Sequence, residues 1–268
     1  MATKIVFTFL ILVALLISAP IWAEEQSAEE LAKVSQNPVA NIISVPFQNN
    51  MNFNTGPKDR TQNELLIEPV IPIHINEDWN VITRTIIPVL SQPTENPSDR
   101  VNGFGPTSIS AFLSPAKASS GLIWGAGPVI QVPTVSNNNL GSRNWGFGST
   151  FAALAIEGHW LVGLLVNNIF STGGSDPSYS TFLAQPFINY NIPGGWYFTS
   201  SPIITANWKA VGSDVWTVPL GGGIGKIWRV GKLGLPIDTQ IQAFYNVATP
   251  TGGPNWTLRF QLKVLLPE

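Results

Sequence analysis

Residues 256–266 read WTLRFQLKVLL, and apolar and polar side chains alternate along this stretch. A period of two marks a β-strand, because successive side chains of a strand point to opposite faces. We interpret the apolar face as contacting lipid and the polar face as contacting water. The apolar face comprises Trp256, Leu258, Phe260, Leu262, Val264 and Leu266, and the polar face comprises Thr257, Arg259, Gln261 and Lys263.

Two stretches near the start of the chain repeat this alternation. Residues 64–75 set Leu65, Ile67, Pro69, Ile71, Ile73 and Ile75 against Glu64, Glu68 and His74. Residues 43–53 set Val45, Phe47, Met51 and Phe53 against Gln48, Asn50 and Asn52. Strands that are apolar on one face and polar on the other are typical of a barrel wall between lipid and a polar interior.

The composition indicates a membrane environment. Charged residues make up 11% of the chain, less than half of the ~25% typical of a soluble domain. After the first 23 residues there is no run of 18 or more apolar residues, so the sequence offers no helical span there. Only a helix or a closed sheet satisfies its backbone hydrogen bonds in lipid. We therefore predict an all-β fold, a transmembrane antiparallel β-barrel of about 12 strands; a soluble β-sandwich with core tryptophans would leave the scarcity of charge unexplained.

The expected strands are separated by turn residues. They cover residues 43–53, 64–75, 79–90, 102–113, 122–132, 145–157, 159–170, 181–192, 196–208, 215–228, 236–247 and 255–266. Short turns at 76–78, 158, 193–195 and 231–234 alternate with longer loops, as at the two ends of an outer-membrane barrel. Aromatic residues near both kinds of connection predict two interfacial girdles: Trp79, Trp160, Trp196 and Trp228 near the turns, and Phe53, Trp145, Phe170, Trp208, Trp216 and Trp256 near the loops.

Prolines within the expected strands weigh against a regular ladder, because each lacks a backbone donor. We expect bulges at these positions, which are Pro69, Pro72, Pro88, Pro128, Pro186, Pro202 and Pro219. Three glycines at 221, 222 and 223 predict a kink or a place where a loop packs closely inside the barrel. A phosphate loop is disfavoured there because no Gly-Lys-Ser/Thr follows.

The chain divides into three parts. Residues 1–23 have the pattern of an export signal: Lys4, an apolar run over 5–17 and small residues before Glu24. An uncleaved anchor helix is the alternative, but the run is shorter than the ~20 residues that a span needs. Residues 24–41 form an N-terminal segment with a short helical pattern over 28–34, either a periplasmic helix, a plug in the lumen or a loose tether. Residues 42–268 form the barrel.

Enzymatic and metal chemistry find little support. The chain has no cysteine and two histidines, a poor set for a metal site. Some twelve-stranded barrels are lipid hydrolases with His and Ser two residues apart, but His74 and His159 lack such a serine. Glu157 and His159 flank a turn and could form a structural pair. We therefore expect no catalytic residue, metal or cofactor, and the near-neutral charge of −2 gives no footprint for nucleic acid.

The polar face of the expected strands is the remaining candidate site. The side chains expected to face the lumen are Glu64, Glu68, Arg84, Asp238, Gln240, Gln242, Arg259, Gln261 and Lys263. Two interpretations stay open. These residues either line a conducting or binding path, or fill a narrow lumen with salt bridges and hydrogen bonds.

Several segments resemble a bacterial family of outer-membrane transporter-like proteins. They include QNPVA at 36–40, SVPFQNN at 44–50, NEDWN at 76–80, TRTIIPV at 83–89, IWG at 123–125, QPFINYN at 185–191, GWYFTSSPIITANW at 195–208 and WTVPLGGG at 216–223. This family often carries the misleading label "neuromedin U" and is related to barrels of the phenol-degradation MetA type. No catalytic or ligand motif accompanies the resemblance.

The resemblance implies a location in the outer membrane of a Gram-negative bacterium and uptake of small, apolar or aromatic solutes. Its implied partners are outer-membrane lipids, a small-molecule solute and the barrel assembly machinery. The alternatives are a barrel-based enzyme of the lipid hydrolase type and a purely structural membrane protein.

Overall fold

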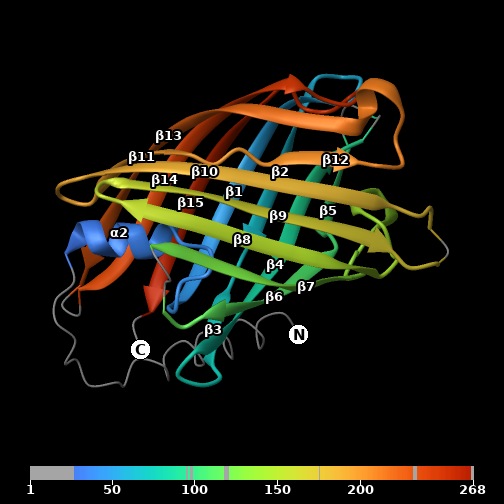
Figure 1. Cartoon of the computed structure of the whole chain (residues 1–268). Coiled ribbons are helices and arrows are strands. Elements are labelled where there is room, and N and C mark those ends of the chain that lie inside the picture. Colours follow the sequence, from blue (N-terminus) through green and yellow to red (C-terminus); the bar gives the residue numbers. More distant parts are fainter. Residues whose placement is uncertain are drawn as a thin grey trace.

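The chain folds into a closed antiparallel barrel of twelve strands (Figure 1). We call each of the twelve a stave, because three of them are split into two shorter strand segments that lie in line. The computed structural model describes residues 27–266 apart from positions 95, 97, 98, 118–120, 175, 232 and 233. The expected export signal therefore lies outside the described residues. Within them, the strands are β1 (Ile43–Thr55), β2 (Arg60–Ile67), β3 (Val70–His74), β4 (Trp79–Pro93), β5 (Arg100–Phe104), β6 (Thr107–Pro115), β7 (Leu122–Val132), β8 (Gly146–Glu157), β9 (Trp160–Ser171), β10 (Ser180–Ile192), β11 (Trp196–Ser200), β12 (Ile204–Asn207), β13 (Trp216–Val230), β14 (Leu235–Ala248) and β15 (Trp256–Leu266).

The barrel closes between its first and last strands. β1 and β15 pair antiparallel in an unbroken register from Ile43 opposite Leu266 to Phe53 opposite Trp256. A closed sheet has no free edge, so every stave has two neighbours. The prediction of an all-β antiparallel barrel of about twelve strands is confirmed.

Three staves are broken, and each break contains a proline. Pro69 separates β2 from β3, Pro106 separates β5 from β6, and Pro202 separates β11 from β12. A proline cannot donate to the ladder, which ends one strand segment and starts another. The sequence suggests irregularity at Pro69 and Pro202 but gives no warning of the break at Pro106.

The outer face of the barrel is apolar. Exposed side chains such as Ile71, Phe198 and Leu220 point away from the lumen, while their neighbours in sequence point inward. Exposed tryptophans gather near both ends of the staves, at Trp145, Trp160, Trp196, Trp208, Trp216, Trp228 and Trp256. No helix among the described residues is long and apolar enough to cross a membrane.

Short and long connections lie at opposite ends of the barrel. The short turns, such as the one at Gly194 and Gly195, lie at the end that also holds helix α2 (Ala28–Gln36) (Figure 1). The longer connections, including the 3-10 helices η1 (Asn138–Leu140) and η2 (Gly212–Val215), lie at the other end. One expected loop, residues 54–63, is wrong in extent, because β1 and β2 continue to Thr55 and from Arg60 and leave only a tight turn.

Candidate functional site

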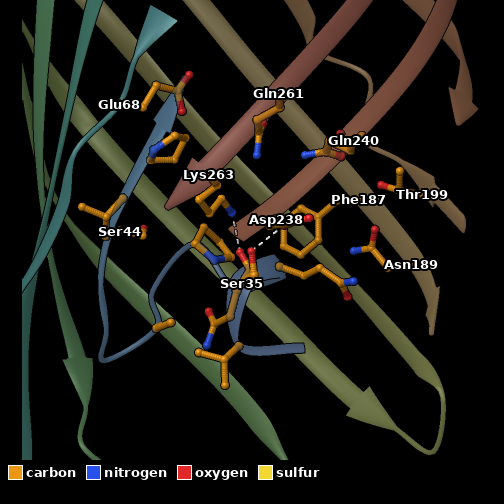
Figure 2. A pocket seen from close by; sticks show the side chains of 18 of the residues that line it. Ser35, Ser44, Glu68, Phe187, Asn189, Thr199, Asp238, Gln240, Gln261 and Lys263 are labelled. Carbon is orange, nitrogen blue, oxygen red and sulfur yellow. Dashed lines mark hydrogen bonds between the residues drawn. The ribbon is translucent and has the colours of Figure 1, made fainter. Parts of the chain in front are cut away.

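A cavity of about 110 Å³ lies inside the barrel. Its wall combines the N-terminal segment between Val34 and Ile42 with inward side chains of strands around the barrel (Figure 2). A water needs about 10–15 Å³ of such volume, and a drug-sized ligand needs about 300 Å³ or more. The lumen as folded therefore has room for several waters and is too small for a large solute.

Six of the nine side chains expected to face the lumen line this cavity. They are Glu68, Arg84, Asp238, Gln240, Gln261 and Lys263. The other three, Glu64, Gln242 and Arg259, lie nearer to the long connections, with Gln242 and Arg259 buried. All nine belong to β2, β4, β14, β15 or the residue that follows β2, and β1, with its buried Gln48 and Asn50, joins these two pairs of strands into one polar face.

Two basic groups of the polar face are tightly bonded. Arg84 Nη2 lies 2.7 Å from Glu68 Oε2, which makes an ion pair across the broken stave. Arg259 donates from Nε to Asn50 Oδ1 at 3.1 Å and from Nη1 to the carbonyl of Ser201 at 2.8 Å. The guanidinium also lies 4.7 Å from the ring centroid of Phe244, a cation-π distance. These groups are held in fixed positions by the wall.

Helix α2 begins with a capping box. Ser27 Oγ accepts from the Glu30 N–H, and Ser27 N–H donates to the Glu30 carboxylate at 2.7 Å. This backbone hydrogen bond lowers the pKa of Glu30. A hydrogen bond from Lys33 lowers the pKa of Glu29, and the nearby His159 lowers this pKa further. The cap starts the helix at the point where the chain enters the barrel.

The C-terminal end of α2 is clamped to the polar face. The Ser35 hydroxyl donates to Asp238 Oδ2 at 2.6 Å, and Lys263 Nζ donates to the Ser35 carbonyl (Figure 2). The Tyr197 hydroxyl donates to the other oxygen of Asp238. Tyr197 has room because its ring lies against Gly225, where a Cβ would come within 2.1 Å of the ring. The close approach is therefore at Gly225 and involves a strand side chain, whereas the sequence predicts a kink or a loop packed inside at Gly221, Gly222 and Gly223.

Further contacts hold α2 across the lumen. Gln36 and Asn191 exchange two side-chain hydrogen bonds, of 2.8 and 3.1 Å. The buried residues Leu31 and Ala32 pack against Tyr197, Ile227 and Leu265. The helix is thus bonded to and packed against inward side chains of the barrel, and its role as a plug stays a prediction.

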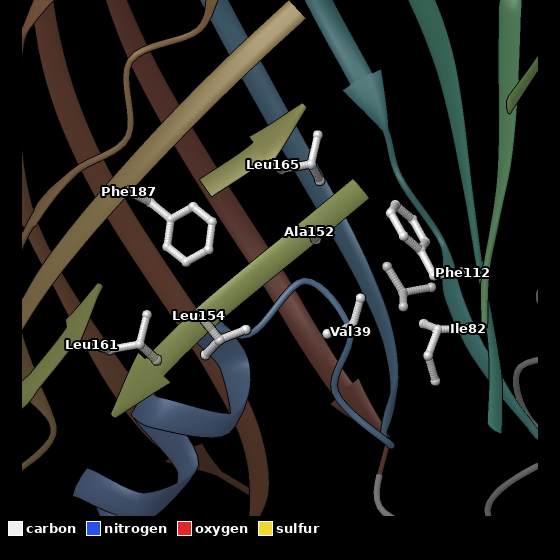
Figure 3. Close-up of a cluster of buried hydrophobic side chains, with 9 residues drawn as sticks. Val39, Ile82, Phe112, Ala152, Leu154, Leu161, Leu165 and Phe187 are labelled. Carbon is white, nitrogen blue, oxygen red and sulfur yellow. The ribbon is translucent and has the colours of Figure 1, made fainter. Parts of the chain in front are cut away.

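The opposite side of the lumen is apolar, which the sequence interpretation missed. A buried cluster lines it, formed by Val39, Val70, Ile82, Phe112, Ala152, Leu154, Leu161, Leu165 and Phe187 (Figure 3). Most of these residues belong to β8, β9 and β10, whose outer faces are apolar as well. With apolar residues on both faces, a strand shows no alternation in hydropathy. The signal that could have revealed the cluster is this unbroken apolar character, as in FAALAI at 151–156.

A loop narrows the barrel at the end away from α2. Leu140 of η1 is buried, and a Cβ at Gly103 would lie 3.0 Å from its Cδ1. Gly103 stands opposite Leu90, and Leu90 stands opposite Glu64, so this contact lies on the inner face of the wall. The Ser136 hydroxyl accepts from the Phe104 N–H at 2.9 Å. The lumen is thus narrowed at both ends.

Neither histidine contacts a serine hydroxyl among the described residues. His74 Nδ1 lies 3.1 Å from Asn80 Oδ1, and His159 Nδ1 lies 3.0 Å from Glu29 Oε1. The expected pairing of His159 with Glu157 across the turn is replaced by the pairing with α2, because the helix brings Glu29 to this turn.

A scan against models of protein families and a search of curated proteins find no match. Solved structures with a similar fold include an outer membrane channel from Pseudomonas putida F1, with a TM-score of 0.65 and 17% identity over 86% of this chain and 98% of that one. An outer membrane phospholipase from Salmonella typhi matches with a TM-score of 0.45 and 15% identity, over 92% and 99% of the two chains. The KdgM porin matches with a TM-score of 0.44 and 12% identity, over 84% and 99%. The first likeness shows that the chain has the fold of an outer-membrane barrel, and the two weaker ones carry no further argument.

Proposed function

We propose that this protein is a channel in the outer membrane of a Gram-negative bacterium and that it passes small, apolar or aromatic solutes. The observation that carries the proposal is that the lumen is polar on one side and apolar on the other. A small aromatic molecule with one polar group can place its ring against Phe187 and Leu165, and its polar group against Gln240 or Gln261, all of which line one cavity. Such an environment is suited to amphipathic molecules that are poorly soluble in water.

Other observations support the same proposal. The apolar outer face suits contact with outer-membrane lipids, and a barrel of this kind needs the barrel assembly machinery for insertion. The similar structure from Pseudomonas putida F1 is described as an outer membrane channel. We also propose a relationship to barrels of the phenol-degradation MetA type, because small aromatic compounds fit the apolar side of the lumen.

The proposal assigns the barrel no hydrolytic activity. Both imidazoles are bonded to Asn80 or Glu29, and neither has the serine partner that a nucleophile would require. A lipid hydrolase is the second candidate from the sequence, and no contact within the described residues favours it.

We expect the protein to fractionate with the outer membrane and to migrate faster on gels before boiling than after it. A closed barrel resists detergent at room temperature and unfolds only on heating, because its hydrogen-bonded sheet has no free edge. The measurement is membrane fractionation followed by gel electrophoresis with and without heating. Recovery as a heat-insensitive periplasmic protein would contradict the proposed location.

We expect weak ion selectivity. The lumen carries three acidic side chains, Glu64, Glu68 and Asp238, beside three basic ones, Arg84, Arg259 and Lys263, and no ring of one sign. In planar bilayers with a salt gradient, the reversal potential of the wild type should lie near zero. Lys263→Gln should shift it toward cation selectivity, whereas Lys58→Gln, in the exposed turn between β1 and β2, should not. A strongly selective wild type would refute the mixed-charge lumen.

A further inference from the structure

The stave formed by β11 and β12 loses its pairing at the centre of the wall. On its β10 side, Ile188 pairs with Ser200 and Ala184 pairs with Ile204. Between these pairs, residues 185–187 face residues 201–203 without a ladder pair. The register places Pro186 opposite Pro202, so neither strand offers a backbone donor at the middle of the gap.

The same stave is also unpaired on its other side. Thr199 pairs with Gly223 of β13, and Thr205 pairs with Thr217. Between them, residues 218–222 of β13 face residues 200–204 without a ladder pair. This part of β13 contains Pro219, which has no donor, and two glycines, which have no side chain to fill the wall. Prolines and glycines of three neighbouring staves therefore surround the one place where the hydrogen-bonded ladders on both sides of this stave are interrupted.

Side chains of the lumen hold the interrupted segment in place. The Ser201 N–H donates to Gln242 Oε1 at 3.1 Å, and the Ser201 carbonyl accepts from Arg259 at 2.8 Å. Toward β13, the Ser200 hydroxyl donates to the Gly221 carbonyl at 2.6 Å. Pro202 is buried and fills the wall between these contacts. Residues 201–203, which we name the shutter, are thus fixed by a few replaceable hydrogen bonds rather than by two ladders.

The lumen cavity reaches the shutter at Ser201, and a depression on the outer face ends beside it at Ser200. The lumen cavity is lined by Phe187, Thr199 and Ser201 (Figure 2). A depression of about 340 Å³ on the outer face is formed by Trp160, Ile188, Tyr190, Phe198, Thr199 and Ser200. Thr199 borders both spaces, so the wall between the lumen and the lipid-facing depression is one strand thick there. The apolar lining of the depression suits an apolar occupant.

We propose that the shutter is a lateral portal through which apolar solutes pass from the lumen into the membrane. This inference rests on the proposed function as a channel. An apolar solute that leaves through the α2 end must pass the polar clamp of Ser35, Asp238 and Lys263, where it would displace hydrogen bonds without replacing them. The route through the shutter leads from Phe187 directly to an apolar surface. Local openings use the segments with the fewest backbone hydrogen bonds, and the shutter is such a segment.

A disulfide across the portal tests the proposal. The natural chain has no cysteine, and directly opposed residues of an antiparallel pair have Cα atoms about 4.5–5.5 Å apart, a distance that a disulfide spans. We would prepare Ile188→Cys with Ser200→Cys, the ladder pair that borders the shutter, and as a matched control Ile241→Cys with Phe260→Cys, a directly opposed pair in the intact ladder of β14 and β15. The probe is N-phenylnaphthylamine, whose fluorescence rises in hydrocarbon, added to vesicles with lipopolysaccharide in the outer leaflet.

We expect the oxidised portal variant to take up the dye at least about tenfold more slowly than the same protein after reduction, because the disulfide ties the chain beside the shutter to β10. The ion conductance should be equal in both states, and the control variant should show no redox effect on dye entry. Comparing two redox states of one protein removes doubt about its folding. Equal dye uptake in the oxidised and reduced portal variant would overturn the lateral portal. No dye entry and no ion conductance in the wild type would instead overturn the proposed channel function.

Discussion

Removal of residues 27–41 should raise the single-channel conductance by about tenfold or more, because a helix with its side chains is about 10–12 Å wide and fills most of a small lumen. The segment from Val34 to Ile42 forms one wall of the interior cavity, and Leu31 and Ala32 are buried against the barrel. The measurement is conductance in planar bilayers for the wild type and the deletion variant.

A double and a single substitution test which contacts of α2 close the lumen. Ser35→Ala with Gln36→Ala removes the hydroxyl bonded to Asp238 and the amide bonded to Asn191, so the channel should open intermittently. Lys33→Ala removes only the i,i+4 pair with Glu29 on the same helix and should leave the conductance unchanged. An unchanged conductance in the deletion variant would mean that the lumen is closed at the end away from α2, where Leu140 narrows it.

Arg259→Met should lower the free energy of unfolding by about 4 kcal/mol, near the lower end of the sum for two hydrogen bonds to a charged group, about 1.5–3 kcal/mol each, and a cation-π contact of about 0.5–2 kcal/mol. The guanidinium joins Asn50 of β1, Ser201 of the shutter and the Phe244 ring of β14. Methionine keeps a similar volume but donates to none of them, and it leaves the carboxylate of Glu64 on the same face with less positive charge nearby. The measurement is urea unfolding in lipid vesicles, followed by tryptophan fluorescence.

Arg259→Lys should recover part of this loss, because one ammonium group cannot reach two acceptors with the fork geometry of a guanidinium. Lys58→Met, in the exposed turn between β1 and β2, should change the stability by less than about 0.5 kcal/mol. A loss in Arg259→Met no larger than this control would mean that the polar face contributes little to holding the staves together.

The fold could be predicted from the sequence because its strongest strands have one apolar and one polar face. In β1, β2 and β15 the outward residues are apolar and the inward residues face a polar lumen, so a period of two is visible. In β8 and β9 this signal is absent, because Ala152, Leu165 and their neighbours are buried against an apolar interior. The strand positions were still recognisable there from turn residues, whereas the character of the lumen was not.

The candidate site was only partly visible for another reason. Asp238, Lys263 and Arg259 stand out as polar residues that alternate with apolar ones along their strands, but their partners Ser35, Tyr197 and Ser201 carry no such pattern. Each of those partners is selected by tertiary contacts between distant parts of the chain. Local sequence therefore identified the wall of the lumen and could not identify what docks against it.

The clamp at Ser35 sets an order for assembly. Ser35 is separated by 203 residues from Asp238 and by 228 residues from Lys263, yet only a short linker joins α2 to β1. Before β1 meets β15, docking of the helix requires closure of a loop of about two hundred residues, whose entropic cost is large. After β1 and β15 have paired, the short linker holds α2 within reach of Asp238 and Lys263. The most N-terminal of the described segments is thus expected to dock last, and its docking marks a barrel in which β1 and β15 have paired.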